Sequence, residues 1–549
     1  MKSFFLLVIL SLLQCSSEII SSSEVYFRIN QVGYSINEPK SAVILSNKNF
    51  LNKKFHIVSV NENEEILEGK IAKNYGQYAS FKYSYQIDFS RVIKTGRYKI
   101  KLEEYISPSF EVGEISYEEM TTALLDFFKV QRCGYTSPYL HKVCHIADAT
   151  SLIFDGKQTD EKLDLTGGWH DAGDYTKFLN TTAYATYMLI FSYEFDPIKF
   201  GFDNDNNGSP DILEEAKIGL DWLLRCNYQN KLLVTQVQDL RDHGVGWRMP
   251  ENDTLRFDRP AFLGIGKNLI GIYVSALAIG ARVWREKFYM DEFADKCLTT
   301  AENFYALRTN VHDVDSSGTG AYLDKTFNGK LALAAIEMFK TSNRKSFLEQ
   351  AKNYANLAGA DYWWSYGDIS TLAHFRLSEY DKKYTDFIKM SLTHYKNNSK
   401  MNVFANGVPF SWGANNTLLG ISLQNILYKK ITASSEFDTV ATEQKDYVLG
   451  KNPWGICFVS GFGFRSSKNL HHQVRFFTNK LPGGFAAGPV NKKLFESYAI
   501  IIYNSNADSQ FQDESAVYYD EKNDYLTNEP TIIANATAIF VTGNLSSNN

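Results

Sequence analysis

The stretch TTALLDFFKVQR, residues 121–132, marks a change in the spacing of apolar side chains along the chain. Its leucines, phenylalanines and valine recur every three or four positions, which is the spacing of a helix with one buried face. Before about residue 117, apolar residues instead tend to alternate with polar ones. The sequence therefore predicts a small β domain followed by a large helical one.

The β domain is predicted from short alternating runs separated by turn-forming residues. Examples are VYFRIN (25–30), SAVILS (41–46), KKFHIVSV (53–60), KYSYQIDFS (82–90) and GRYKIKLEE (96–104). Six or seven short strands of this kind are typical of an immunoglobulin-like β-sandwich. We expect this domain over residues 24–115. No Pro- or Ser-rich linker follows it, so the sandwich is expected to pack directly on the helical domain.

The helical domain is expected over residues 117–545, with about a dozen helix-spaced segments such as DILEEAKIGLDWLLRC (211–226) and LIGIYVSALAIGARVWREKF (269–288). Long loops rich in Gly, Asp, His and Trp lie between these segments. Loops of this kind on a helical scaffold are where binding and chemistry usually occur. The expected fold class is therefore mainly α, with the chemistry in the loops.

Composition narrows the class of partner. The formal net charge is only −5, from 57 basic and 62 acidic residues, and the signs are well mixed. This distribution argues against nucleic acid or an anionic membrane as a partner. Aromatic residues make up 14% of the chain, which suits a surface that stacks flat, neutral ligands such as sugars. A monomer is the default expectation.

The N-terminus, MKSFFLLVILSLLQCSSE, has one lysine, a short apolar run and then small polar residues. This layout predicts a signal peptide over residues 1–18 and a secreted protein, since the apolar run is too short to span a bilayer. A lipoprotein cleavage site before Cys15 is the alternative, but Gln14 fits poorly where a small residue is wanted. Five cysteines remain after processing, an odd number that argues against a disulfide scaffold.

The loop GGWHDAGDYTKF, residues 167–178, carries Asp171 and Asp174. Hydrolysis of a glycosidic bond needs one carboxylate to activate water and a protonated carboxyl group to donate to the leaving oxygen. Glu529 is the candidate acid, because aromatic neighbours can raise its pKa by desolvation. Pro530 indicates a helix start beside it. The alternatives are a solvated turn or cation site for the aspartates, and a carboxylate that only complements the helix dipole for Glu529.

A family resemblance emerges when three further stretches are added. They are RINQVGYSINEPKSAVI (28–44), NPWGICFVSGFGFRSSKNLHHQVRF (452–476) and YYDEKNDYLTNEPTIIANA (518–536). Together with the aspartate loop, they resemble the glycoside hydrolase family nine cellulases that carry an N-terminal immunoglobulin-like domain. The resemblance covers nearly the whole mature chain and implies an (α/α)6-barrel catalytic domain.

The resemblance implies catalytic roles for five residues. Asp174 would be the general base, Asp171 would help to hold the attacking water, and Glu529 would be the general acid. Asp520 would support the active-site hydrogen bonds, and His471 would contact the sugar next to the scissile bond. Such enzymes invert the anomeric centre, so the carboxyl groups of base and acid are expected about 6.5–9.5 Å apart.

Substrate contacts are also expected by resemblance, at His243, Trp247, His472, Arg475 and Tyr525. Trp412 could stack on a sugar or lie in the core. Two departures from the family pattern are Gln473, where arginine is usual, and Asn328-Gly329, where an acidic pair is usual. Neither removes a proton-transfer group, so activity is expected, with effects on substrate range or cleavage mode.

Two metal sites are predicted. Cys133, Cys144, His145 and His170 offer two thiolates and two imidazoles, and the resemblance implies structural zinc held by these four residues; spacing alone would favour a disulfide. The stretch DNDNNGSPDILEE (203–215) matches a calcium loop. Its expected ligands are Asp203, Asp205, Asn207, Ser209, Asp211 and Glu214. The alternative for this stretch is a solvated turn that caps a helix.

The expected function is a secreted, inverting β-1,4-glucanase that cuts internal bonds of cellulose or related β-glucans and contains structural zinc and calcium. One alternative is an exo-acting β-glucosidase or exo-β-glucosaminidase on the same fold. A non-catalytic carbohydrate-binding protein is disfavoured, because such a protein has no need of base, water-holding and acid carboxyl groups together.

Overall fold

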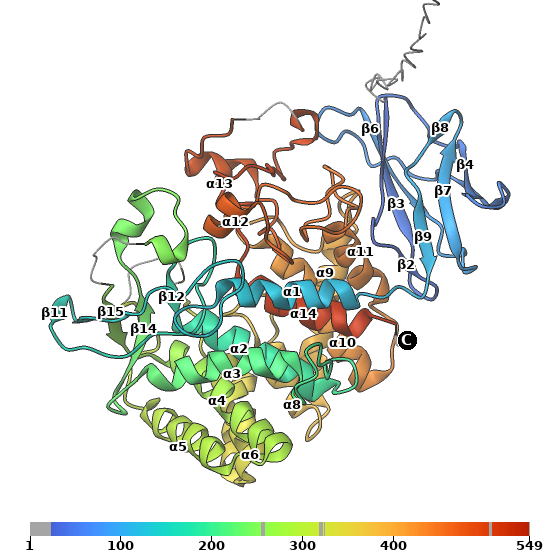
Figure 1. Ribbon diagram of the computed structural model, residues 1–549. Helices are drawn as coiled ribbons and strands as arrows, with labels where there is room; N and C mark the ends of the chain where they lie inside the picture. The colour runs from blue at the N-terminus through green and yellow to red at the C-terminus, as the bar shows by residue number, and fades with distance from the viewer. Residues whose placement is uncertain (1–23, 254–258, 318–321, 323, 504–507, 548–549) are drawn as a thin grey trace, which may run out of the picture.

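The computed structural model describes residues 24–547 apart from 254–258, 318–321, 323 and 504–507, and it contains two differently built parts (Figure 1). A β-sandwich comes first in the chain and a larger body of helices follows. The predicted signal peptide and Cys15 lie outside the described residues. In the part that is described, no helix combines the length and apolar character needed to cross a membrane.

The first part is a sandwich of two sheets. Its strands are β1 (Val25–Arg28), β2 (Tyr34–Ser35), β3 (Ser41–Ser46), β4 (Lys54–Ser59), β5 (Glu65–Lys70), β6 (Tyr83–Asp88), β7 (Gly96–Leu102), β8 (Tyr105–Ile106) and β9 (Phe110–Gly113). One sheet has the order β1-β3-β6, and the other has the order β2-β9-β7-β4-β5 with β8 beside β7. In β7, buried Tyr98, Ile100 and Leu102 alternate with less buried residues, as expected for a strand with one face on a core. The predicted β-sandwich is confirmed.

The sandwich docks directly on the helical part through buried polar contacts. Arg28 Nε donates to the carbonyl of Pro453 at 2.7 Å. Ser41 Oγ donates to Glu443 Oε1, also at 2.7 Å. The partners in each bond are more than 400 residues apart in the chain, so early and late parts of the sequence meet at this interface.

The helices of the second part are α1 (Glu118–Gln131), α2 (Leu179–Phe195), α3 (Asp211–Arg225), α4 (Lys267–Phe288), α5 (Asp291–Leu307), α6 (Asn328–Ser342), α7 (Lys345–Ala358), α8 (Ser370–Leu377), α9 (Lys383–Ser399), α10 (Ala414–Thr432), α11 (Asp438–Val448), α12 (Gln473–Thr478), α13 (Lys492–Ser497) and α14 (Ile532–Leu545). Three short 3-10 helices are η1 (Leu240–Gly244), η2 (Pro250–Asn252) and η3 (Ser509–Phe511).

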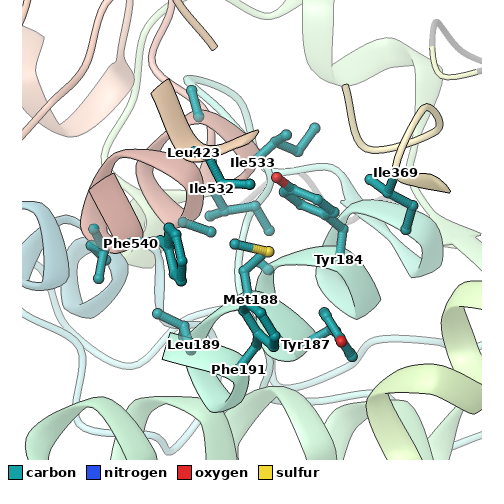
Figure 2. Close-up of a cluster of buried hydrophobic side chains, with 14 of the residues drawn as sticks. Tyr184, Tyr187, Met188, Leu189, Phe191, Ile369, Leu423, Ile532, Ile533 and Phe540 are labelled. Carbon is teal, nitrogen blue, oxygen red and sulfur yellow. The ribbon is translucent and has the colours of Figure 1, made fainter. Parts of the chain in front are cut away.

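The helices are arranged as an inner ring with outer partners. The inner helices α2, α4, α6, α8, α10 and α14 contact one another in that order, and α14 closes the ring on α2. Each inner helix also contacts an outer one: α3 on α2, α5 on α4, α7 on α6, α9 on α8, α11 on α10 and α1 on α14. Helix α2 is an example of an inner helix: it is buried on every side and carries apolar side chains on every face. In Figure 2, Tyr184, Met188 and Phe191 of α2 lie beside Ile532 and Phe540 of α14.

A third sheet, which the sequence does not predict, lies among the helices. Its strands are β10 (Leu152–Phe154), β11 (Lys157–Thr159), β12 (Lys177–Phe178), β13 (Asn227–Tyr228), β14 (Leu232–Val237) and β15 (Ala261–Gly264). The order is β11-β10-β15-β14-β12, with β13 beside β14. Strand β12 lies at the end of the aspartate loop and immediately before α2, so the sheet anchors the segment that carries the candidate base.

Candidate active site

The aspartate loop folds tightly between α1 and α2. The amide of Asp171 donates to the carbonyl of Thr176 at 2.8 Å, and the amide of Thr176 donates to Asp174 Oδ1 at 3.0 Å. Gly168 has φ +69°, and a Cβ there would lie 2.7 Å from Trp222, so only glycine fits. This geometry holds the two aspartates on one short turn.

Glu529 lies just before α14. The helix begins at Ile532, and its N-cap is Thr531, whose hydroxyl accepts from the amide of Ala534 at 3.2 Å. The prediction that Pro530 is the first helical residue is therefore wrong, because Pro530 precedes the cap. Glu529 is consequently not a first-turn carboxylate of α14; it belongs to the loop that faces the aspartates.

Two hydrogen bonds join the acid segment, residues 528–532, to the base segment, which is the aspartate loop. The amide of Gly173 donates to Glu529 Oε1 at 3.1 Å, and the amide of Ile532 donates to the carbonyl of Asp171 at 3.0 Å. Since Gly173 directly precedes Asp174, the candidate base and acid are brought to the same place. The structure thus unites residues that lie more than 350 positions apart.

The histidine segment, residues 471–473, bonds to both the acid segment and the base segment. The amide of His471 donates to the carbonyl of Asn528 at 3.0 Å, and the amide of Gln473 donates to the carbonyl of Gly173 at 3.1 Å. The imidazole of His471 is oriented by its Nδ1 atom, 2.7 Å from the carbonyl of Lys522. His471 is therefore held next to the candidate acid.

The electrostatics distinguish Glu529 from an ordinary surface carboxylate. Burial raises the pKa of Glu529 well above its usual value, and the charges of Asp174 and Asp171 raise it further. The bond from Gly173 opposes this shift because it favours the charged form. Burial also raises the pKa of Asp171 to about 7, against the effect of the nearby Thr181 hydroxyl. A carboxyl group that keeps its proton near neutral pH can serve as a general acid.

Asp520 braces the backbone that leads to His471, and its role in catalysis stays a prediction. Its carboxylate accepts from the amides of Lys468 and Asn469 at 2.8–3.1 Å. A second brace comes from Asn528, whose side-chain amide donates to the carbonyl of Asn469 at 2.7 Å and whose Oδ1 accepts from the hydroxyl of Tyr518. Both braces fix the backbone just before His471.

A row of aromatic rings lies on both sides of His471, next to the candidate acid Glu529. The indole of Trp247 stacks on Phe476, with centroids 5.2 Å apart and planes within 8°, and lies 4.9 Å from His471. His471 in turn lies 5.9 Å from Tyr525, which is 6.3 Å from Trp412. Trp412 is 37% exposed, so the alternative that it lies in the core is wrong. Such a row offers stacking faces for several sugar rings.

His472 is corrected from a substrate contact to a buried support. It is 2% exposed, and its Nε2 atom lies 2.7 Å from Gln131 Oε1. The amide nitrogen of Gln131 donates to the carbonyls of His170 and Ala172 in the aspartate loop. Burial lowers the pKa of His472 to about 3, so the ring is neutral. Because the amide oxygen of Gln131 can only accept, Nε2 is the nitrogen that donates. His472 therefore positions the base segment.

The remaining expected contacts have varied surroundings. Arg475 donates from Nε to the carbonyl of Lys468 and from Nη1 to Asn479, both at 2.9 Å, and its substrate contact stays a prediction. His243 belongs to η1, but its side chain lies outside the described residues. Gln473 uses its Oε1 atom to accept from the amide of Arg248 at 2.9 Å. The departure at Gln473 thus ties the Trp247 loop (residues 239–253) to the histidine segment.

The departure at Asn328-Gly329 has a packing role. These two residues begin α6, and a Cβ at Gly329 would lie 2.2 Å from Ser370 Oγ. The next residue, Lys330, is buried and paired with Asp324. An acidic side chain at position 329 would therefore collide with Ser370 of α8, and it would add charge beside an existing buried ion pair.

The four predicted zinc ligands converge. Their donor atoms all lie within 4.8 Å of one another, with His145 Nδ1 3.2 Å from His170 Nε2 and Cys144 Sγ 3.9 Å from His170 Nε2. Tetrahedral zinc requires ligand atoms about 3.3–3.8 Å apart, close to these values. Cys133 and Cys144 are buried free thiols, so the disulfide alternative is wrong. Asp253 lies 3.2 Å from His145 Nε2, the outer-shell contact usual for a metal-bound histidine.

The predicted calcium loop converges in part. Carboxylate oxygens of Asp203, Asp205 and Asp211 lie within 4.8 Å of one another. The amide nitrogen of Asn207 instead donates to Asp205 and Glu214, at 3.0 and 2.6 Å. The Ser209 amide donates to Asn207 Oδ1 at 2.9 Å. Three of the six expected ligands are therefore gathered as a cation site requires.

Three residues at the site were not identified from the sequence. They are Gly173, which bonds to the acid; Gln131, which supports the base segment; and Tyr322, whose hydroxyl approaches Asp171. Gly173 lies inside the quoted aspartate loop, where a glycine between two acidic residues was a usable signal. Gln131 and Tyr322 come from other segments and gave no such signal.

The chain is similar to known proteins over most of its length. The family description "Glycosyl hydrolase family 9" matches residues 117–542, and "Cellulase N-terminal ig-like domain" matches residues 23–107. Endoglucanase D of Acetivibrio thermocellus is 27% identical over 479 residues, covering 81% of this chain and 74% of its own. A cellodextrinase of Butyrivibrio fibrisolvens is 25% identical over 559 residues, covering 93% and 98%. A metagenome-derived glycoside hydrolase family 9 endoglucanase structure has a TM-score of 0.79 at 25% identity, covering 95% of this chain and 99% of its own. The family 9 match over residues 117–542 takes in more than half of the chain and every segment that builds the site, so the chain belongs to glycosyl hydrolase family 9.

Proposed function

We propose that this protein is a secreted, inverting β-1,4-glucanase that cuts internal bonds of cellulose and related β-glucans. The observation that carries the proposal is the bond from the amide of Gly173 to Glu529, which sets the candidate base Asp174 beside the candidate acid. The row of aromatic rings from Phe476 to Trp412 supports a polymeric substrate, because a polymer can stack on several rings at once.

The proposed mechanism is a single displacement. Asp174 takes a proton from a water molecule held with the help of Asp171, and the water attacks the anomeric carbon. Glu529 donates its proton to the leaving oxygen, which the raised pKa favours at neutral pH. We expect the two carboxyl groups to be about 6.5–9.5 Å apart in the substrate complex.

The test is product analysis by proton NMR, with cellohexaose and carboxymethyl cellulose as substrates. We expect α-anomers from internal cuts, and loss of turnover by at least about 10³-fold in Asp174→Ala. Glu118→Ala, an exposed carboxylate at the start of α1, is the control. A β-anomeric product contradicts the mechanism.

An exo-acting hydrolase is the second candidate. It is favoured by the cellodextrinase of Butyrivibrio fibrisolvens, to which the chain is similar over 98% of that protein's length. Release of only glucose from chain ends, with no fall in the viscosity of carboxymethyl cellulose, would establish this reading. Turnover of chitosan oligomers alone would favour a glucosaminidase.

We also propose that the helical domain, over residues 117–545, is an (α/α)6 barrel and that residues 24–115 form the sandwich domain. The closed ring of inner helices with one outer partner each supports the barrel. Secretion with removal of residues 1–18 and a monomeric state complete the proposal. Mass spectrometry of the secreted protein and light scattering test these two points.

Zinc and calcium are proposed as structural ions. Zinc would be held by Cys133, Cys144, His145 and His170, whose donor set closes a tetrahedral site. When bound, zinc would cross-link the end of α1 to the aspartate loop and take no part in proton transfer. Calcium would be held by Asp203, Asp205 and Asp211, with Asn207, Ser209 and Glu214 as further ligands. Elemental analysis of the purified protein tests both ions.

A further inference from the structure

Arg248 lies where three parts of the site meet. It is 9% exposed, and all its polar backbone and side-chain groups have partners. Its amide donates to Gln473 of the histidine segment, and its carbonyl accepts from the hydroxyl of Tyr175, which directly follows Asp174. The backbone of Arg248 is thus fixed by the histidine segment and the base segment.

The side chain of Arg248 points toward the metal site. Its Nε and Nη2 atoms donate to both oxygens of Asp253, at 2.8 and 3.0 Å. The same carboxylate lies 3.2 Å from His145 Nε2. Since His145 would bind a metal through Nδ1, one carboxylate links a metal ligand to the guanidinium of Arg248.

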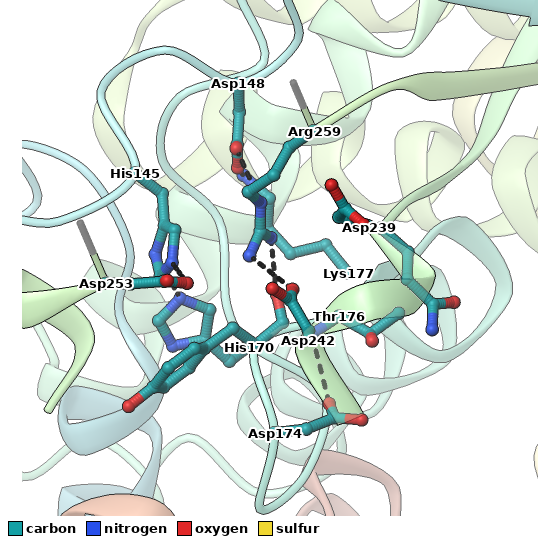
Figure 3. A network of polar contacts seen from close by, with 12 residues as sticks. His145, Asp148, His170, Asp174, Thr176, Lys177, Asp239, Asp242, Asp253 and Arg259 are labelled. Atoms are coloured by element: carbon teal, nitrogen blue, oxygen red, sulfur yellow. Dashed lines mark hydrogen bonds and ion pairs between the residues drawn. The ribbon is translucent and has the colours of Figure 1, made fainter. Parts of the chain in front are cut away.

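A second path of buried charges leads from Arg248 to the metal site, and Figure 3 shows its members Asp242, Arg259, Asp148 and Lys177. Arg248 Nη2 donates to Asp242 at 2.9 Å. From there, Asp242 pairs with Arg259, Arg259 with Asp148, and Asp148 with Lys177, at 2.8–3.3 Å. Lys177 Nζ lies 3.7 Å from the sulfur of Cys133, another metal ligand.

The neighbour of Arg248 is Trp247, whose indole lies against His471 and Phe476. A planar, bidentate guanidinium–carboxylate pair fixes both position and direction better than a single contact. Because Trp247 and Arg248 are adjacent in the chain, we expect a shift of Arg248 to displace the Trp247 ring from His471 and Phe476.

We propose that Arg248 couples the metal site to the sugar-stacking surface: it orients His145 through Asp253 and holds Trp247 in the aromatic row. Arg248 is a positioning residue and touches no reacting atom. The inference rests on the proposed glucanase function only for the role of Trp247, whereas the coupling itself is independent of substrate.

The experiment compares Arg248→Gln and Asp253→Asn with the wild type as full-length protein. Zinc affinity is measured by competition with a chromogenic chelator. Because His145 loses its orienting partner, we expect about a 10- to 100-fold weaker zinc affinity in Asp253→Asn. Controls are Arg344→Gln and Asp313→Asn, which remove the same charges from exposed ion pairs.

The second readout is the position of Trp247. Acrylamide quenching of tryptophan emission is measured in the zinc-loaded proteins, and the Trp247 share is obtained by difference from Trp247→Phe. We expect quenching of Trp247 to rise at least twofold in Arg248→Gln, with a higher KM for cellohexaose and a smaller change in kcat.

Zinc affinity and Trp247 quenching within twofold of wild type in both variants would overturn the coupling. Changes in both readouts without any glucanase activity in the wild type would instead support the coupling and refute the proposed function. The two failures are therefore distinguishable, and circular dichroism of each variant identifies loss of folding.

Discussion

Replacing Gly173 with alanine tests the contact on which the active-site argument depends. A Cβ at this position would lie 2.2 Å from the carbonyl oxygen of His471 and 3.1 Å from Glu529 Oε1. The first atom belongs to the backbone of a segment that is hydrogen-bonded on both sides, so it cannot rotate away. The two segments must separate.

The size of the effect follows from the overlap. Carbon and oxygen in van der Waals contact lie more than about 3 Å apart, so the segments must move by about 1 Å. A displacement of about 1 Å between reacting groups can reduce kcat about 100-fold, or about 2.7 kcal/mol in activation free energy. Overpacking should also lower the free energy of unfolding by about 1–3 kcal/mol.

The assay measures kcat and KM on cellohexaose together with thermal unfolding. Gly359→Ala is the matched control, because Gly359 has φ +68° at the end of α7, with nothing within 4 Å of an added Cβ. It should lose stability through backbone strain and keep full kcat. If Gly173→Ala retains wild-type kcat, the inferred contact between base and acid segments is wrong.

Three further outcomes are expected. Glu529→Gln should abolish turnover, and its melting temperature should exceed that of wild type at pH 7. The folded-state pKa of Glu529 is raised, so the stability of the wild type falls as pH rises from the unfolded value of about 4.5 through the folded pKa. Glutamine does not titrate, so the variant escapes this loss of stability. A lower melting temperature across that range would contradict the raised pKa. The pH–kcat profile should fall on the alkaline side as Glu529 loses its proton, and an unchanged rate up to pH 10 would exclude it as the acid. His472→Ala should lower kcat about 10-fold with little change in KM, because Gln131 loses its donor; a KM effect alone would return His472 to the substrate contacts.

Much of the fold could be predicted from local patterns. Alternation before residue 117 and helical spacing after it separated the sandwich from the helices, because each pattern reflects burial of one face. The third sheet, formed by β10–β15, was missed, since its strands are two to six residues long and scattered between helices. The start of α14 was predicted too early. Proline is common just after a helix N-cap, but Pro530 lies just before one, because the Thr531 side chain caps this helix.

The candidate site was predictable where one segment carries several functional groups. Asp171 and Asp174 share a short loop, and the four metal ligands lie on two nearby stretches. The role of His472 was not predictable, because two adjacent histidines look alike in sequence and only burial separates them. His471 faces the aromatic row, whereas His472 faces Gln131.

The docking of the sandwich has a consequence for synthesis. Arg28 and Ser41 leave the ribosome early, whereas their partners Pro453 and Glu443 follow after about 400 more residues. At about 5–20 residues per second, that interval lasts roughly 20–80 seconds. Throughout this time Arg28 and Ser41 lack the partners that they have in the folded protein. The sandwich therefore cannot complete its docking contacts until α11 and the segment after it have been made, and a chain truncated before α11 lacks both of these partners.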